Sequence, residues 1–94
     1  MKFQRVIIQR NESTAWQEFE DNMVVVTPHT RKIHILSGAG CMIWQSLEEP
    51  KNFSQIVDTV FDEYEINYQQ AEKDIEAFIQ ELSDKDIVKL INKT

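Results

Sequence analysis

The pattern of apolar and polar residues between Ala15 and Ser37 indicates β-strands. Two short strand-like runs, Trp16–Phe19 and Met23–Thr27, flank the turn-forming residues Glu20–Asn22. The second run ends at Pro28, which lacks the N–H that a central strand donates. A third run, Lys32–Leu36, alternates so that Ile33 and Ile35 share one face. We therefore expect a three-stranded antiparallel sheet built as a meander.

The pattern then changes to helical spacing. Residues 37–40 close the sheet, with Ser37 as the expected N-cap of a first helix that ends before Pro50. Asn52 and Gln55 have the spacing of a capping box, which predicts the start of a second helix. The apolar residues that follow recur three and four positions apart, so a second helix is firmly indicated.

A third helix is predicted after Asn67 and ends near Lys85. Residues 87–91 form a short apolar tail that we expect to pack back on the body. Strands grouped before helices indicate an α+β fold. Three helices with short links suit a winged helix-turn-helix-like arrangement. The length of 94 residues corresponds to one domain.

Residues 1–14 are polar apart from Phe3 and the cluster Val6–Ile8. Three interpretations of this segment stay open: an extra strand, a partner-docking tail or a flexible arm. We treat it as an N-terminal arm and residues 15–94 as the folded domain.

The charge distribution narrows the classes of partner. The net charge is −6, made up of +1 in residues 1–47 and −7 in residues 48–94. A duplex-binding domain normally carries a basic face, so the acidic second half argues against nucleic acid. The chain has a single cysteine, no apolar run of membrane-spanning length and no signal-peptide pattern. We therefore expect a cytoplasmic protein without a membrane partner.

Candidate chemistry is sparse. His29, His34 and Cys41 are too few for a structural zinc site, which needs three or four ligands in paired short spacings, so no metal is expected. The motif Gly38-x-Gly40 is too short for a dinucleotide-binding loop and follows an antiparallel strand, and the sharp turn from sheet to helix explains both glycines. We expect no cofactor and no catalytic residues.

Two features are not explained by the core alone. The Lys32–Leu36 strand is last in the meander, so its edge is a candidate rail for an extended peptide. The third helix carries a core stripe and, beside it, a mixed stripe that suits the wall of a groove, although Phe78 in the core with surface charges around it is the simpler alternative. The core stripe is Tyr68, Ile75, Ile79 and Leu82, and the mixed stripe is Ala71, Asp74, Phe78, Glu81 and Lys85.

An ordered set of short motifs between Trp16 and Val88 resembles the PqqD family, named after the D protein of coenzyme PQQ synthesis. The matching pieces are Ile35-Leu36-Ser37, Gly38-Ala39-Gly40, Ile43-Trp44 with Leu47, Asn52-Phe53-Ser54-Gln55-Ile56-Val57, Glu63-Tyr64, Asp74-Ile75, Phe78-Ile79, Leu82 and Asp86-Ile87-Val88. This chain departs from the family pattern at Ser37, at the Asn52/Gln55 cap and at Asp86, where the family has glycine in a sharp turn.

The resemblance implies a non-catalytic peptide chaperone. Such domains bind the leader segment of a ribosomally made precursor peptide by strand addition and present it to a modifying enzyme, often a radical-SAM enzyme. The peptide-binding residues that the resemblance implies are Lys32, Ile33, His34, Ile35, Leu36, Asp74, Phe78 and Glu81.

Two other functions stay open. A winged-helix DNA-binding protein has an overlapping fold, but the third helix carries five acidic residues against Lys73 and Lys85. A subunit that only stabilises a larger enzyme is the third interpretation.

Overall fold

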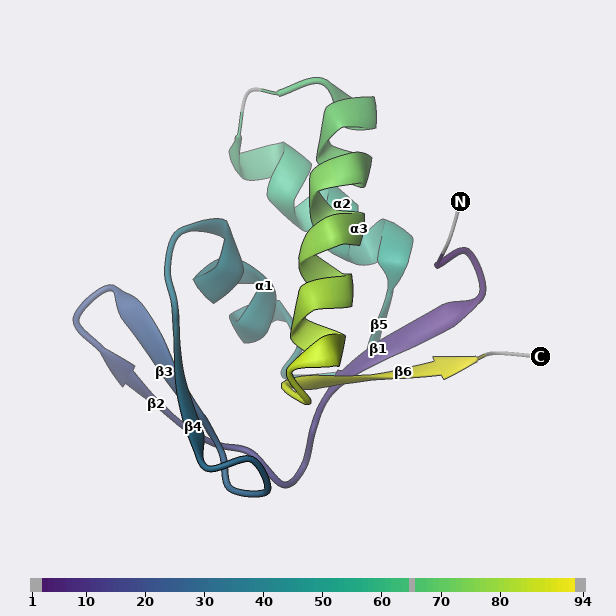
Figure 1. Ribbon diagram of the computed structural model, residues 1–94. Coiled ribbons are helices and arrows are strands. Elements are labelled where there is room, and N and C mark those ends of the chain that lie inside the picture. Colours follow the sequence, from purple (N-terminus) through teal and green to yellow (C-terminus); the bar gives the residue numbers. More distant parts are fainter. Residues whose placement is uncertain (1–2, 65, 93–94) are drawn as a thin grey trace.

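The computed structural model describes residues 3–64 and 66–92 (Figure 1). The elements in chain order are β1 (Val6–Arg10), β2 (Ala15–Phe19), β3 (Asn22–Thr27), β4 (Lys32–Leu36), α1 (Ala39–Ser46), β5 (Lys51–Asn52), α2 (Phe53–Glu63), α3 (Tyr68–Asp84) and β6 (Val88–Asn92). The α+β class is confirmed, with two three-stranded antiparallel sheets and three helices.

The strands β2, β3 and β4 form the meander sheet, in that order, as the alternation predicts. Its register pairs Gln17 with Val24 and Val24 with Ile35. The tight turn between β2 and β3 is confirmed, and Glu20 takes a positive φ of 57° in it. At the next hairpin Arg31 takes a φ of 56°. Both hairpins therefore use a left-handed residue to reverse the chain.

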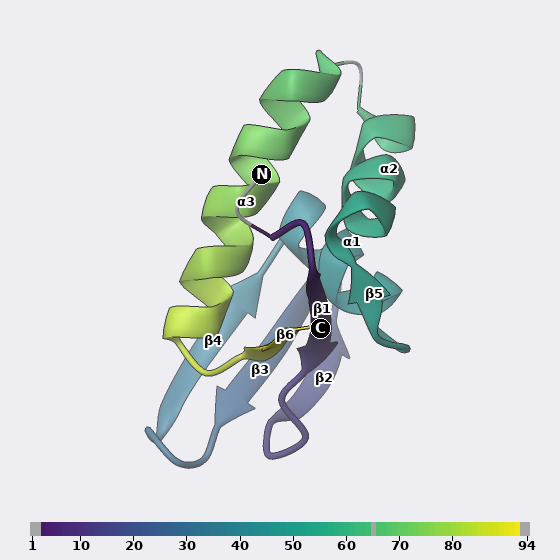
Figure 2. The same ribbon diagram turned by 90° about the vertical axis from the view of Figure 1, so that its right-hand side faces the viewer.

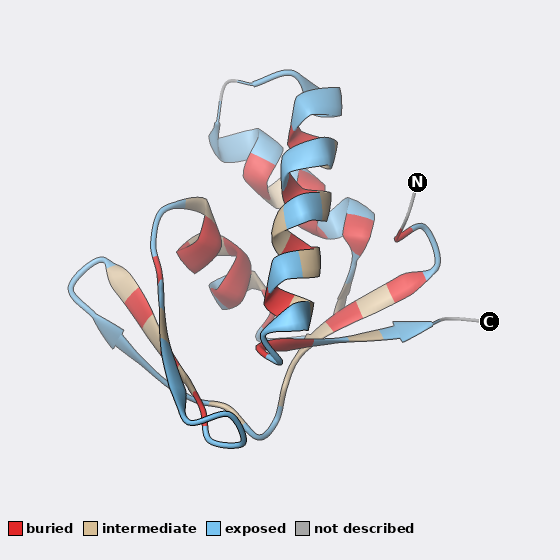
Figure 3. Ribbon diagram, in the orientation of Figure 1, coloured by how far each residue is buried: buried red, intermediate tan, exposed pale blue. Residues whose placement is uncertain are grey.

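Buried and intermediate residues alternate along β3 (Figure 3), because the two faces of the meander sheet differ in burial. The inner face places Met23, Val25 and Leu36 in the core, where each is less than a tenth exposed. Ile33 and Ile35 occupy the outer face and are 69% and 67% exposed. The sheet thus covers the core with one face and leaves the other face uncovered.

Local signals explain the helix boundaries. Asn52 and Gln55 form the predicted capping box, in which the Asn52 side chain accepts from the Gln55 N–H at 2.9 Å and the Gln55 side chain accepts from the Asn52 N–H at 2.9 Å. The Asn67 side chain caps α3 by accepting from two backbone N–H groups. The prediction that Ser37 caps α1 is wrong: the N-cap is Gly38, whose φ of 56° and ψ of −127° suit glycine alone.

The second sheet was not predicted. β1 is its central strand and pairs with β5 on one side and β6 on the other, and we call it the closing sheet. Its partners come from distant parts of the sequence, so no local pattern reveals it. Figure 1 shows it on the opposite side of α3 from the meander sheet. The apolar tail of the sequence does pack back, with Ile87 and Val88 buried.

The N-terminal segment is therefore an extra strand, the first of the three alternatives. Residues 6–10 pair with β6, and Ile7 and Ile8 also pair with β5. Ile8 is fully buried and Phe3 is 3% exposed, so the flexible-arm interpretation is corrected for this segment. The domain begins before residue 15. Residues 1–2 of the predicted arm lie outside the described residues.

The turn from α3 into β6 keeps its sharp geometry without the family's glycine. Asp86 adopts a φ of 60°, which aspartate tolerates better than most residues. The Asn11 side chain donates to the Asp86 carbonyl at 2.8 Å, and the Asn11 N–H donates to the Ile87 carbonyl at 3.0 Å. The loop after β1 thus holds the turn in place.

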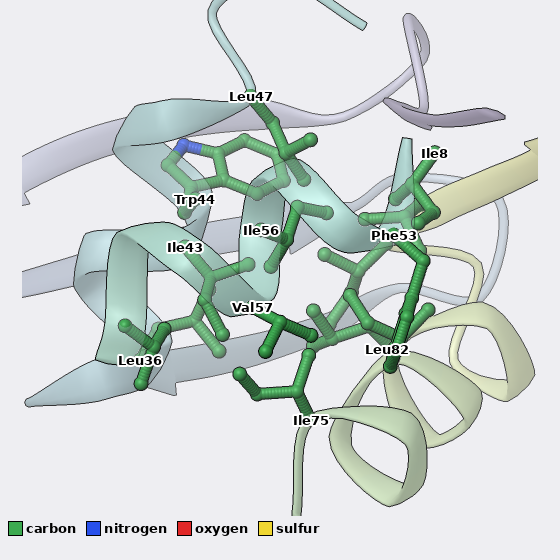
Figure 4. Packing of buried hydrophobic residues seen from close by; sticks show 14 of the residues in the cluster. Ile8, Leu36, Ile43, Trp44, Leu47, Phe53, Ile56, Val57, Ile75 and Leu82 are labelled. Carbon is green, nitrogen blue, oxygen red and sulfur yellow. The ribbon is translucent and has the colours of Figure 1, made fainter. Parts of the chain in front are cut away.

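The core joins all of these layers. Figure 4 shows Ile8 from β1, Leu36 from β4, Ile43 from α1, Val57 from α2 and Ile75 from α3 meeting in one cluster. The view turned by 90° shows α3 and α2 side by side above the strands (Figure 2).

Arg10 connects the closing sheet to the meander sheet. Its guanidinium lies 4.8 Å from the centre of the Trp16 ring and 4.7 Å from that of Trp44. Its Nε and Nη2 donate to the Trp44 carbonyl at 3.1 and 2.6 Å, which satisfies an acceptor in the last turn of α1. One side chain therefore links β1, β2 and α1.

Candidate functional site

The strand β4 is an open edge of the meander sheet. Its only strand partner in the described part of the chain is β3. An edge strand presents unpaired N–H and C=O groups that another extended chain can pair with. The predicted residues Lys32–Leu36 coincide with β4 from end to end.

A groove separates β4 from α3. This cavity has a volume of about 340 Å³ and is lined by residues of both elements. Phe78, Glu81 and Lys85 supply its helix wall, while Ile33–Leu36 supply its strand wall. The structure therefore brings together six of the eight predicted site residues, namely Ile33, His34, Ile35, Leu36, Phe78 and Glu81.

The remaining two predicted residues lie at opposite ends of this arrangement. Lys32 begins β4 on the same face of the sheet as His34 but does not line the groove. Asp74 lies in a neighbouring apolar cavity of about 320 Å³, and its carboxylate accepts from the Gln70 side chain at 2.9 Å. Phe78 lines both cavities, so the two form adjacent compartments on one side of α3.

The neighbouring cavity contains residues that the sequence analysis did not select. Its walls include Ala39 and Gly40 of α1, Tyr64 and Ile66 after α2, and Ala71 of α3. A Cβ atom on Gly40 would lie 2.9 Å from Cζ of Phe78. The lack of a side chain at position 40 is the sequence signal that marks this close approach, but only the packing of α1 on α3 shows which residue uses the space.

The stripes predicted on α3 need one correction. Ala71 is fully buried and belongs to the core, whereas Tyr68 is 37% exposed and does not. Tyr68 instead donates to the Asp58 carboxylate at 3.0 Å. Phe78 packs partly buried against the core, so it is both a core neighbour and a wall of the groove.

His34 has a polar environment at the inner face of β4. Its Nε2 lies 3.3 Å from the Thr27 hydroxyl. Burial lowers the pKa of His34, and the positive charges of Lys85 and Lys32 lower it further, which favours the neutral imidazole. A neutral ring offers one donor and one acceptor.

The described residues offer little for covalent or metal chemistry. Within residues 3–64 and 66–92 no group of three or more His, Cys, Asp or Glu side chains is arranged to hold a metal ion. Burial raises the pKa of the Cys41 thiol, and Glu18 and Asp21 raise it further, which disfavours the reactive thiolate. In the same part of the chain, no helix combines the length and apolar character needed to cross a bilayer.

The fold and the groove define a winged helix-turn-helix-like domain with an open edge strand facing its longest helix. The family model for coenzyme PQQ synthesis protein D (PqqD) matches residues 22–88, and the chain belongs to this family.

Comparison with solved structures adds one informative match. TbiB1 in complex with the TbiA(beta) leader peptide is similar with a TM-score of 0.81 and 26% sequence identity, over 86% of this chain and 94% of that chain. No curated protein matches.

Proposed function

We propose that this chain binds the leader segment of a ribosomally made precursor peptide by adding it as a strand to β4. The observation that carries the proposal is the open edge of β4 beside the groove lined by α3. Main-chain pairing supplies affinity in this mode of recognition, and side-chain pockets on alternate positions supply specificity. Membership of the PqqD family and the similarity to a leader-bound protein support the same assignment.

We further propose that the chain is not a catalyst and acts in the cytoplasm by presenting the peptide to a modifying enzyme, with radical-SAM enzymes as the first candidates. Holding the substrate on a partner of the enzyme raises its effective concentration at the active site. The raised pKa of the Cys41 thiol disfavours a nucleophilic thiolate, which supports binding without covalent chemistry.

The test is a ¹⁵N–¹H NMR titration with the leader of the short peptide encoded beside this gene. We expect the largest shifts in the amides of β4 and along α3 from Asp74 to Lys85. Amides of β1 and β6 in the closing sheet serve as the internal control and stay unchanged. Shifts confined to the closing sheet would overturn strand addition at β4.

A modified peptide separates main-chain pairing from side-chain contact. A leader carrying N-methyl groups at alternate residues lacks half of its backbone donors but keeps its side chains. One of the two alternating methylation patterns should abolish binding, because only one set of N–H groups faces β4. Equal binding of both methylated peptides would contradict the edge-strand mechanism.

A duplex DNA titration examines the rival function. The acidic composition of α3 predicts no shifts at low salt, since duplex binding depends on phosphate neutralisation. Saturable shifts along α3 with DNA and none with the leader would replace the peptide-binding proposal.

A further inference from the structure

The outer face of β4 carries two large apolar side chains that nothing in the described structure covers. Ile33 and Ile35 are 69% and 67% exposed, although both lie in a paired strand. Across the sheet they are opposite Val26 and Val24, which are half-buried. No charged residue lies in the two rows of paired residues that cross the outer face. These rows are Ala15–Val26–Ile33 and Gln17–Val24–Ile35.

The inner face at the start of β4 has the opposite character. No Asp or Glu occurs between Asp21 and Glu48, so the β3–β4 hairpin carries only the positive charges of Arg31 and Lys32. Lys85 lines the groove with His34, but Glu81 pairs with it at 2.9 Å, so Lys85 adds no unpaired positive charge. In the described part of the chain Lys32 has no ion-pair partner.

The neighbouring cavity, on the other side of Phe78, differs in charge from the start of β4. Asp74 is the charged residue of the neighbouring apolar cavity. The two ends therefore differ: Lys32, a cation without an ion-pair partner in the described part of the chain, lies beside the groove at the start of β4, and the neighbouring cavity is apolar with one carboxylate. This polarity exists within a protein whose net charge is −6.

We propose that the peptide segment recognised by β4 is two-faced, with apolar residues opposite Ile33 and Ile35 and a carboxylate side chain pointing inward at the Lys32 end. The inference rests on the proposed strand addition. Side chains of an added strand alternate between faces, so positions opposite Ile33 and Ile35 are two residues apart and point outward together. A residue opposite Lys32 or His34 points inward, to the face of the sheet on which Lys32 lies.

The experiment uses the full chain and a random library of twelve-residue peptides displayed on phage. The enriched peptides should share two apolar residues at positions i and i+2. They should also carry Asp or Glu either between these two residues or directly beside one of them. One enriched peptide is then synthesised, and its binding is mapped by NMR and measured by titration.

Matched variants separate the two contacts. Ile35→Thr keeps a β-branched residue and should weaken binding about two- to fivefold, while Ile91→Thr, at a 44% exposed position of the closing sheet, should leave binding unchanged. Lys32→Gln should weaken binding about two- to fivefold at low salt, and this loss should shrink in about 1 M salt. Lys73→Gln changes the net charge equally but lies on the exposed side of α3, so it is the control.

The outcomes distinguish this inference from the proposed function. Peptides that shift β4 amides but lack the apolar pair and the acid overturn the inference and leave strand addition intact. Peptides that shift only other amides overturn strand addition itself. If Lys73→Gln weakens binding as much as Lys32→Gln, the carboxylate contact at Lys32 is wrong.

Discussion

The closing sheet and the meander sheet have the same number of strands and the same antiparallel pairing, yet they differ in connectivity and in exposure. The closing sheet joins three distant segments around β1 and buries Ile8 completely. The meander sheet forms from consecutive strands, and it keeps an exposed outer face and an open edge at β4. The comparison indicates that the closing sheet is held by long-range pairing, whereas the meander sheet is the one that offers an open edge, which is where we propose the peptide binds.

The largest expected effect on stability comes from truncating a buried side chain in the closing sheet. Ile8→Ala removes a fully buried side chain and should lower the free energy of unfolding by about 2–5 kcal/mol. The same truncation at the exposed Ile35 should change it by less than about 0.5 kcal/mol. Urea denaturation followed by circular dichroism measures both. Equal losses at the two positions would contradict the difference in burial between the central strand of the closing sheet and the outer face of the meander sheet.

The junction between the meander sheet and α1 is the next most sensitive position. Gly38→Ala forces a side chain into a conformation with φ of 56° and ψ of −127°, and should cost about 1–3 kcal/mol of unfolding free energy. Ser37→Ala is the matched control and should be nearly neutral, because no side chain caps α1. A thermal melt of each variant gives the comparison. A larger loss for Ser37→Ala would restore that residue as the functional cap.

The end of β5 in the closing sheet makes a smaller, local contribution to the free energy of unfolding. Asn52 ends β5 and caps α2, so Asn52→Ala should cost about 0.5–2 kcal/mol. Asn52→Ser retains a side-chain acceptor and should recover most of that loss. Chemical denaturation resolves a difference of this size. Failure of serine to recover stability would show that pairing of β5 matters more than the cap.

The smallest effect on stability should accompany a clear effect on binding. Gly40→Ala favours the helical state of α1, but its Cβ would push the Phe78 ring, so the net change should stay within about 1 kcal/mol. The displaced ring narrows the groove beside β4 and should weaken leader binding severalfold. In a Phe78→Leu background the same substitution should have less effect on binding, and calorimetric titration of the four proteins measures this coupling. Additive effects would show that the two positions act separately.

Much of the fold could be predicted from the sequence because the deciding interactions are local. Alternation located β4 to the residue, and the Asn52/Gln55 spacing located the start of α2. The closing sheet was missed because Val6–Ile8 gives no sign of its partners, which lie more than 40 positions away.

The candidate site was predicted in part for the same reason. The open edge and the groove stripe follow from strand order and helical spacing. The apolar cavity was missed, because Gly40 and Phe78 meet only after α1 packs on α3. The stripes were also assigned wrongly for Tyr68 and Ala71, and again the reason is a contact between helices. The Tyr68 hydroxyl donates a hydrogen bond to the Asp58 carboxylate on α2, at the exposed surface.

The long-range pairing in the closing sheet has a consequence for how the protein folds. Ile8 pairs with Leu90, 82 positions further along the chain, so this contact closes a very large loop and carries a high entropic cost. Such topologies fold more slowly than locally connected ones. The hairpins of the meander close short loops, so we expect them to form earlier and to leave one edge of β4 unpaired while the core is still incomplete. During that interval we expect mutual repulsion between copies that each carry a charge of −6 to disfavour pairing of two such edges.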